Sequence, residues 1–208
     1  MTTILVTGFG PFPGAPFNPT GPLTARLRRL RRPALADVRV VTHVFTTSYA
    51  AVDRDLPRLI AQYQPDVLLM FGLAARTRML RIETRARNRL ALLPGADGGS
   101  LRRATIANGG AATLRLSAPA RHLLAAARTT RLPMTISHDA GKYLCNYLIW
   151  RAVEAAGKAD GPRLVAFVHV PEVPRTARRR GRRRRFSLRD LTRAGTQVLT
   201  ALAVAARR

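Results

Sequence analysis

The sequence predicts an α/β fold: a single-domain, three-layer α/β/α sandwich with a mostly parallel central sheet. Two observations predict it. Short apolar runs alternate with helical segments along the chain, a pattern typical of parallel strands covered by helices on both faces. In addition, a length of 208 residues suits one domain with a sizeable core. We therefore expect a single domain over residues 1–208.

The expected elements alternate through the whole chain, as this fold class requires. Continuous apolar runs bounded by turn residues predict strands at 3–7, 37–45, 66–71, 133–137 and 163–170. Apolar residues at helical spacing predict helices at 20–32, 49–64, 118–129, 142–156 and 187–206. An extended segment is expected at 79–86, and the Gly/Ala-rich stretch at 95–113 is expected to form a long loop or an irregular hairpin.

Arginine dominates the charge of the chain. There are 36 basic against 11 acidic residues, for a formal net charge of +25. The densest stretch is 175–185, where eight of eleven residues are arginine, and we expect a flexible, solvated loop there. The alternative is binding to nucleic acid or another polyanion, but no nucleic-acid-binding motif accompanies the charge. We therefore expect polyanion binding of the nonspecific kind only.

Composition also bears on location. One cysteine in the whole chain, with no secretory signal at the N-terminus, favours a reducing cytoplasm. The longest apolar run, residues 67–75, is too short to span a bilayer, so we expect no membrane partner.

The single cysteine, Cys145, is the first candidate for chemistry. A lone thiol cannot form an intramolecular disulfide, so it is either inert packing or a reactive group. Asp139 is expected to cap the helix that follows, which puts Cys145 in or near the first turns. There the unpaired backbone N–H groups and the positive end of the helix dipole favour thiolate over thiol. The helix alone leaves a buried, inert cysteine equally open.

A histidine and a glutamate on two other segments could complete a thiol-based site. The strand-like run at 163–170 places His169 at its end, where loops gather. A Cys/His pair is the minimum for this chemistry, because the imidazole takes the thiol proton and later protonates the leaving amine. Glu83 is the only acid between Asp66 and Asp97, and it could hold the imidazole in the right tautomer. Taken singly, His169 could be a strand-edge histidine and Glu83 a surface ion-pair partner.

Four parts of the chain match one known pattern, in the same order. They are residues 4–12 with Asn18-Pro19-Thr20, Gly72-Leu73-Ala74 with Ile82-Glu83 and Asn88, Ser137 with Ala140-Gly141 and residues 143–146, and residues 167–171. Together they resemble the pyroglutamyl-peptidase I family of cysteine peptidases, from residue 3 to about residue 172. The resemblance implies an omega peptidase that removes N-terminal pyroglutamate from peptides without a metal or other cofactor. It implies Cys145 as nucleophile, His169 as general base and acid, and Glu83 as the orienting carboxylate.

The resemblance also implies a site for pyroglutamate, a neutral lactam that calls for an apolar pocket with few polar groups. Phe9 and Phe12, expected in the Gly/Pro loop directly after the first strand, correspond to phenylalanines that sandwich the ring. Asn18 is expected to brace that loop, and backbone groups around Leu73 to bond the lactam. Backbone N–H groups at the start of the cysteine-bearing helix would hold the oxyanion, with the Asn146 amide as a candidate helper.

Two positions depart from the family pattern: Leu92 stands where an arginine is usual, and Ala75 where a glycine is usual. The first leaves open a diverged member that acts on another small acyl or amide substrate. The charge leaves open a polyanion-binding protein on the same fold. Family members often form homo-oligomers, and the altered C-terminal region puts that assembly in question here. His43 and His122 are expected to be structural, and His138 to point away from the site.

Overall fold

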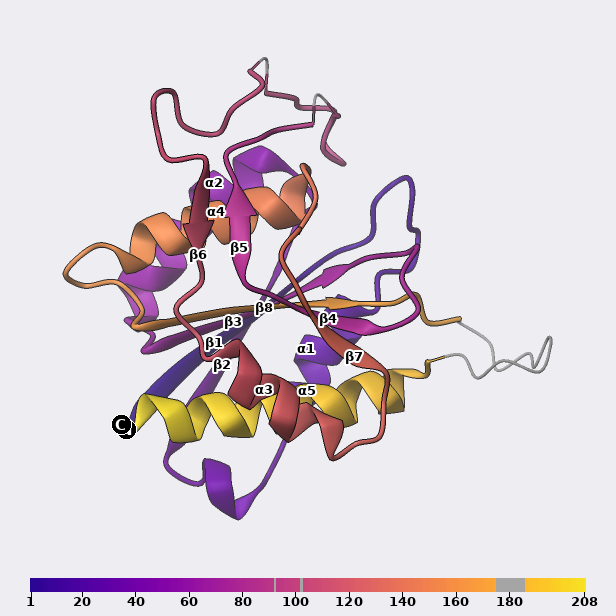
Figure 1. Cartoon of the computed structure of the whole chain (residues 1–208), viewed down its shortest axis with the longest axis vertical. Coiled ribbons are helices and arrows are strands. Elements are labelled where there is room, and N and C mark those ends of the chain that lie inside the picture. The colour runs from indigo at the N-terminus through magenta and orange to yellow at the C-terminus, as the bar shows by residue number, and fades with distance from the viewer. Residues whose placement is uncertain (92, 102, 175–185) are drawn as a thin grey trace.

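The computed structural model describes residues 1–91, 93–101, 103–174 and 186–208. Within them the chain forms a central six-stranded sheet with helices on both faces, and a separate two-stranded sheet (Figure 1). This confirms the predicted three-layer architecture. The arginine-rich stretch at 175–185, expected to be a flexible loop, and Leu92 both lie outside the described residues.

The observed elements follow the predicted alternation. In chain order they are β1 (Thr2–Phe9), α1 (Thr20–Arg28), a 3₁₀ turn (Pro33–Leu35), β2 (Val38–Phe45), α2 (Tyr49–Tyr63), β3 (Val67–Leu73), β4 (Leu80–Glu83), β5 (Arg85–Arg87), β6 (Thr113–Arg115), α3 (Ala120–Arg128), β7 (Met134–Ser137), α4 (Leu144–Ala156), β8 (Leu164–Val170) and α5 (Leu188–Ala206). None of the described helices is long and apolar enough to cross a membrane.

Helix α1 ends earlier than predicted, at Arg28 instead of residue 32. Pro33 begins the 3₁₀ turn, and the residue before it, Arg32, is extended at φ −139° and ψ 139°. A proline disfavours helical backbone in the preceding residue, so the helical pattern cannot run up to this point.

Two strands of the main sheet, β4 and β7, run against the other four. The strand order is β2-β1-β3-β8-β4-β7, and every neighbouring pair is parallel except β4 with β8. The predicted extended segment at 79–86 is divided between two sheets, because β4 joins the main sheet while β5 pairs with β6. The connection from β5 to β6 contains most of the stretch at 95–113, so its two ends form a short antiparallel pair, as the hairpin alternative predicted.

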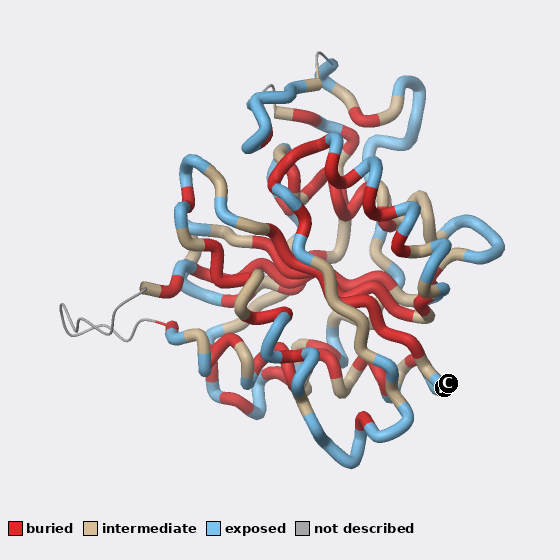
Figure 2. Tube along the Cα trace, turned by 180° about the vertical axis from the view of Figure 1, so that it is seen from behind, coloured by how far each residue is buried: buried red, intermediate tan, exposed pale blue. Residues whose placement is uncertain are grey.

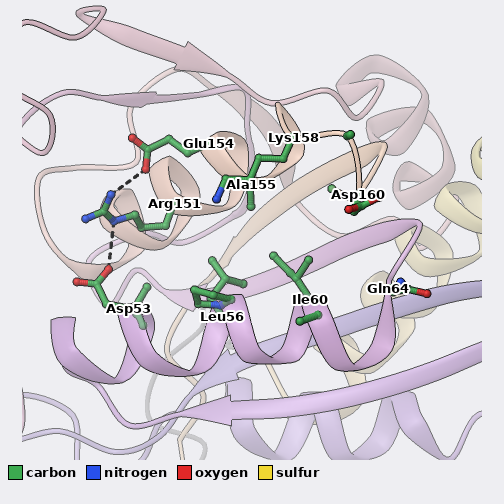
Figure 3. Close-up of a pocket in the computed structure, with 14 residues that line it drawn as sticks. Asp53, Leu56, Ile60, Gln64, Arg151, Glu154, Ala155, Lys158 and Asp160 are labelled. Atoms are coloured by element: carbon green, nitrogen blue, oxygen red, sulfur yellow. Dashed lines mark hydrogen bonds and ion pairs between the residues drawn. The ribbon is translucent and has the colours of Figure 1, made fainter.

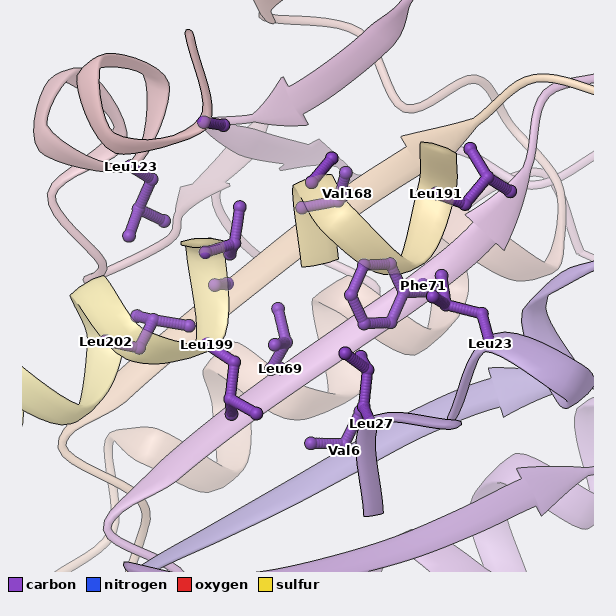
Figure 4. Packing of buried hydrophobic residues seen from close by; sticks show 14 of the residues in the cluster. Val6, Leu23, Leu27, Leu69, Phe71, Leu123, Val168, Leu191, Leu199 and Leu202 are labelled. Carbon is purple, nitrogen blue, oxygen red and sulfur yellow. The ribbon is translucent and has the colours of Figure 1, made fainter. Parts of the chain in front are cut away.

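Two apolar clusters cover the two faces of the sheet. Helices α1, α3 and α5 lie on one face, where Leu27, Phe71 and Leu199 belong to the same cluster (Figure 4). Helices α2 and α4 lie on the other, with buried Tyr147 and Trp150. Figure 2 shows the strands buried between these layers. Since side chains alternate along a strand, each strand serves both clusters, and its end can also contribute to a site.

Candidate active site

The candidate site lies on the α2/α4 face, near the carboxyl ends of β3 and β8. These two strands are parallel and in register there, with Gly72 opposite His169. On the other side of β8, the antiparallel strand β4 sets Glu83 opposite Phe167. Phe167 belongs to the cluster of the α2/α4 face, and strand alternation puts His169 on that same face. Three elements distant in sequence, β4, α4 and β8, thus contribute Glu83, Cys145 and His169.

Helix α4 places the thiol directly over β3. Cys145 is the second residue of α4 and is partly exposed. Its Sγ atom lies so near Gly72 that a Cβ atom built there would be 2.6 Å from the sulfur. The same Cβ would lie 2.6 Å from the ring of Phe167. Only a glycine at residue 72 therefore lets the thiol and the phenylalanine occupy these positions.

His169 and Glu83 form a buried pair. The Nδ1 atom of the imidazole lies 2.7 Å from Oε1 of Glu83. His169 is 3% exposed and Glu83 2% exposed, so water does not weaken this contact. Because Nδ1 is engaged by the carboxylate, Nε2 is the ring nitrogen left for the thiol. Cys145 is near enough to the imidazole to act on its protonation, so the thiol, the imidazole and the Glu83 carboxylate form one Cys–His–Glu group.

The electrostatics of this chain favour a charged imidazole. Burial acts to lower the pKa of His169. The charge and hydrogen-bonding effects of Cys145 and Glu83 outweigh burial and raise this pKa to about 9. The buried imidazolium is stabilised because both Glu83 and Cys145 favour its charged form. This is the arrangement that a thiolate–imidazolium pair needs at neutral pH.

The approach to α4 differs from the prediction at Asp139. The N-cap residue of α4 is Tyr143, with no side-chain cap. Asp139 lies further upstream, where its Oδ1 accepts a 3.0 Å hydrogen bond from the Gly141 backbone N–H. Gly141 itself has φ +83°, which favours glycine, and it turns the chain into the helix. The expectation that Asp139 caps the helix was wrong because this tight turn uses its side chain first. The predicted place of Cys145, in the first turn, is confirmed.

Asn146 fixes the start of α4 and is fully occupied in doing so. Its Oδ1 accepts from the Arg87 backbone N–H at 2.8 Å. Its Nδ2 donates to the carbonyls of Arg87 at 2.8 Å and Arg89 at 3.0 Å. The amide N–H donors are therefore engaged by backbone carbonyls and do not point to an oxyanion, for which the amide was a candidate helper. It instead ties the thiol-bearing helix to the segment that follows β5.

The residues predicted to bind substrate lie at the same end of the sheet. Phe9, the last residue of β1, is 2% exposed, and its ring lies 5.9 Å from that of Phe45. Phe12 is partly exposed in the following loop, where its backbone pairs with Ala15. Phe9 therefore belongs to the core as part of β1 and not to the loop in which it was expected, because the strand runs two residues further than predicted. Phe12 keeps part of its surface exposed.

Asn18 and Leu73 complete the predicted substrate residues. The Asn18 side chain donates to the Gly10 carbonyl at 3.1 Å and accepts from both the backbone N–H and the hydroxyl of Thr20. Asn18 thus braces the loop, as expected. Leu73 is the partly exposed last residue of β3 and lies opposite Val170 in the register. Its backbone therefore reaches the edge at which Cys145 sits.

Sequence reasoning missed two neighbours of this chain. Gly72 appeared only as part of a matching motif, and its contact with the sulfur depends on how α4 packs on β3. Arg81 lies opposite His169 across the strand pair, and its Nε atom is 3.6 Å from Oε1 of Glu83. Period-two alternation along an extended segment could have placed Arg81 on the face of Glu83, two residues away.

The remaining histidines lie outside this chain. His43, on β2, has Nε2 3.5 Å from Oδ2 of Asp55 on α2. His122 is exposed on α3. His138 is exposed, and its Nδ1 bonds the Thr84 hydroxyl instead of the thiol or the imidazole of His169.

A separate pocket of about 550 Å³ lies between α2 and α4 (Figure 3). Leu56 and Ile60 of α2 lie along it, and Arg151 of α4 bridges Asp53 and Glu154 at 3.1 and 2.9 Å. None of the predicted site residues lines this pocket. It is therefore distinct from the place where the thiol chemistry is expected.

Comparison with known proteins identifies the family. A family profile described as pyroglutamyl peptidase matches residues 2–205. The chain belongs to the pyroglutamyl peptidase family. It is 27% identical to the pyrrolidone-carboxylate peptidase of Pyrococcus furiosus, with 82% of this chain and 81% of that protein covered. It is 30% identical to the one from Clavibacter michiganensis subsp. michiganensis, with 82% and 79% covered.

Solved structures show the same fold. The chain is similar to the pyrrolidone carboxyl peptidase of Thermococcus litoralis, with a TM-score of 0.88, 24% identity, and 100% of this chain and 96% of that one covered. It is also similar to the enzyme from Fervidobacterium islandicum AW-1, with a TM-score of 0.86, 24% identity and 97% and 98% covered. The family membership predicted from four motifs is confirmed, and it classes the protein as a cysteine-type omega peptidase.

Proposed function

We propose that the protein removes N-terminal pyroglutamate from peptides, with Cys145 as nucleophile, His169 as general base and acid, and Glu83 as the orienting carboxylate. The observation that carries the proposal is the buried 2.7 Å contact between His169 and Glu83, with the only thiol of the chain near enough to act on the same imidazole. Family membership supplies the substrate, because a Cys–His–Glu chain alone could act on many acyl groups.

The reaction proceeds in two acyl-transfer steps. The Cys145 thiolate attacks the carbonyl carbon of the pyroglutamyl residue, and the C–N bond breaks as the His169 imidazolium gives its proton to the leaving amine. The product of this step is a thioester on Cys145. A water molecule then attacks the thioester while His169 takes one of its protons. Pyroglutamate leaves, and the imidazolium–thiolate pair is restored.

Glu83 and the start of α4 stabilise the charges that develop. The carboxylate holds Nδ1, so that Nε2 always faces the thiol, and its negative charge favours the imidazolium. The first backbone N–H groups of α4 have no partner within the helix, and they are proposed to hold the oxyanion. Their positive end also favours the thiolate of Cys145.

The lactam ring is proposed to bind on the β1 side of Cys145. Phe12 would cover the ring, with Phe9 forming the apolar wall beneath it, and Asn18 holds the loop that carries Phe12. The backbone of Leu73, at the end of β3, would bond the lactam. A neutral ring needs this mixture of apolar surface and a few backbone groups, because it carries no charge for an ion pair.

Hydrolysis of a pyroglutamyl chromogenic amide by the purified protein tests the proposal, with Cys145→Ala as the control. We expect release of the chromophore by the wild type and none by the variant. A second chromogenic amide, with an acetyl or prolyl group in place of pyroglutamyl, separates the family activity from another small acyl substrate. Faster cleavage of that second amide would favour the diverged enzyme.

We also propose that the protein binds polyanions without sequence preference. The net charge of +25 supports this, as does Arg85 on β5 lying directly opposite Arg115 on β6, where an anion would relieve the repulsion. Binding to mixed-sequence oligonucleotides should weaken steeply as salt is raised, because condensed counterions are released on binding. Strong discrimination between sequences at physiological salt would contradict this.

The need for a reduced thiol supports a reducing compartment, and we propose the cytoplasm as the place of action. Cys145 is the only cysteine and is partly exposed, so oxidation would stop the reaction. Cell fractionation with an activity assay tests this, and recovery of the activity outside the cytoplasm would contradict it.

A further inference from the structure

We propose that Arg81 is a positioning residue that shares the Glu83 carboxylate with His169 and limits how tightly the imidazolium is held. This rests on the proposed function, since it assigns a further residue to the same Cys–His–Glu chain. Among the residues that the structure describes, Arg81 forms an ion pair with Glu83 and no hydrogen bond or ion pair with the thiol or the imidazole. It therefore acts through Glu83.

The register of the sheet puts Arg81 in this position. On β4, Arg81 and Glu83 are two residues apart, so both side chains lie on the face that carries His169. Arg81 is directly opposite His169, and Glu83 is opposite Phe167. Only the antiparallel insertion of β4 beside β8 brings these residues together.

One carboxylate oxygen serves both cations. Oε1 of Glu83 lies 2.7 Å from Nδ1 of His169 and 3.6 Å from Nε of Arg81. The Arg81 Nε and the Glu83 Oε2 atoms are both buried without a hydrogen-bond partner. The guanidinium is therefore held near the carboxylate, at a distance longer than a hydrogen bond, while the imidazole takes the shorter contact.

A guanidinium at this distance has two opposite effects on the site. It favours the ionised form of Glu83, which His169 needs as a partner. It also repels the imidazolium on the same oxygen, so the imidazolium gives up its proton more readily than it would with Glu83 alone. Since arginine stays charged throughout the working range, this influence is constant with pH.

Other ionisable groups near the pair reach solvent. Besides Cys145 on α4, the segments around it carry His138, Asp139, Lys142, Arg85 and Arg87, all of them exposed or partly exposed. His138 bonds Thr84, and Asp139 pairs with Arg87 at 3.2 Å. Solvent screens such charges. The Arg81 side chain is also partly exposed, but its Nε atom, which faces Glu83, is buried. Among the described residues, Arg81 is the arginine in contact with Glu83.

The test compares Arg81→Gln, Arg81→Lys and Arg78→Gln with the wild type. Arg78→Gln is the matched control, because it removes the same charge from an exposed residue that precedes β4. The first readout is the alkaline limb of kcat/KM against pH for a pyroglutamyl chromogenic amide. The second is the rate of iodoacetamide alkylation of Cys145 against pH, which needs no peptidase activity because Cys145 is the only thiol.

We expect Arg81→Gln to move the alkaline limb, and the upper inflection of alkylation, upward by about one pH unit. Arg81→Lys keeps a positive charge and should stay near the wild type, as should Arg78→Gln. Profiles of Arg81→Gln that coincide with the wild type would overturn the proposal. So would equal shifts in Arg81→Gln and Arg78→Gln. If no protein cleaves the amide, the proposed function fails, and the alkylation profiles still decide the role of Arg81. Should Arg81→Gln not fold, Arg81→Thr takes its place. If the upper inflection of alkylation in Arg81→Thr lies below that of the wild type, or is absent, the result counts equally against the proposal.

Discussion

Two histidines of this protein each face a buried carboxylate, yet they are held in opposite charge states. His169 Nδ1 lies 2.7 Å from Glu83, and His43 Nε2 lies 3.5 Å from Asp55. The pKa of His169 is raised to about 9, although burial opposes it. Burial lowers the pKa of His43, and the attraction of Asp55 does not make up for it. At neutral pH the first imidazole is held charged and the second neutral.

Competition for the carboxylate explains the difference. Asp55 receives two 2.9 Å hydrogen bonds from Arg54 and lies 3.5 Å from Arg58. Its charge is therefore already matched, and little attraction remains for His43. Arg54 and Arg58 also repel a charged imidazole directly.

Glu83 is less fully matched, because its arginine contact is the longer one at 3.6 Å to Arg81. Cys145 then adds a second group that raises the pKa of His169. A histidine beside a carboxylate is thus no mark of catalysis by itself. Two features distinguish the His169 pair: its carboxylate is not neutralised by close arginine hydrogen bonds, and a thiol lies near the imidazole.

The largest loss of activity is expected on substitution of Cys145. Cys145→Ala should lower kcat by at least about 10⁴-fold, because the nucleophile is lost. Cys145→Ser should retain only a small residual rate, since a hydroxyl is a far weaker nucleophile. Steady-state hydrolysis of a pyroglutamyl amide measures both, with circular dichroism to show that the fold is kept. Turnover at the wild-type rate by the alanine variant would end the thiol mechanism.

The two carboxylates should respond differently to neutralisation. Glu83→Gln keeps the shape of the side chain but removes the charge that steadies the imidazolium, so kcat should fall by about 10²- to 10⁴-fold. Asp55→Asn should leave kcat near the wild-type value and lower the midpoint of thermal unfolding, because it breaks the contacts of Arg54 and His43. The same rate assay and a melting curve measure the pair. Equal losses of kcat in Glu83→Gln and Asp55→Asn would contradict the different roles assigned to the two carboxylates.

Displacing the thiol should lower the rate of hydrolysis while leaving the charged residues around His169 unchanged. In Gly72→Ala the new Cβ would lie 2.6 Å from the sulfur, so Cys145 must move and the rate should fall by about 10- to 100-fold. Gly157→Ala is the matched control, since its Cβ would meet no atom nearer than 3.5 Å and its φ is −76°. Rate assays on both variants decide this. A Gly72→Ala enzyme as active as the control would show that the sulfur position is not critical.

The smallest expected effect is the pH dependence of stability, which should have opposite signs at the two histidines. The folded pKa of His43 lies below its ordinary 6.5, so its neutral form is favoured and stability is lost as pH falls through 6.5. The folded pKa of His169 is about 9, so its contribution is complete below 6.5 and is lost as pH rises through 9.

Urea unfolding across this range tests both signs. Relative to the wild type, His43→Gln should lose less stability between pH 7 and pH 5. His169→Gln should lose less between pH 7 and about pH 9.5. The same pH slope in both variants would contradict the assignment of opposite charge states.

Much of this arrangement could be predicted from the sequence. The alternating pattern gives a parallel sheet, and parallel strands bring β3 and β8 to one edge with His169 at the end. Cys145 near the start of a helix follows from the apolar spacing of 142–156. The sequence alone therefore predicts that these two residues lie near each other.

Other features depended on long-range pairing, which no local pattern reports. The sequence does not show that β4 inserts antiparallel beside β8, so Arg81 could not be set opposite His169. Nor does it show that the Asp139 side chain accepts a hydrogen bond from the turn at Gly141 instead of capping α4. In both cases the outcome was decided by which of several available partners a side chain meets, and that depends on tertiary packing.

Trapping the acyl-enzyme tests the central claim most directly. The protein would be mixed with a reactive pyroglutamyl ester, quenched in acid within the first turnover, digested and analysed by mass spectrometry. We expect the pyroglutamyl group as a thioester on the peptide that contains Cys145, and no adduct in Cys145→Ala. An unmodified Cys145 peptide while pyroglutamate is being released, or an adduct on another residue, would contradict the account.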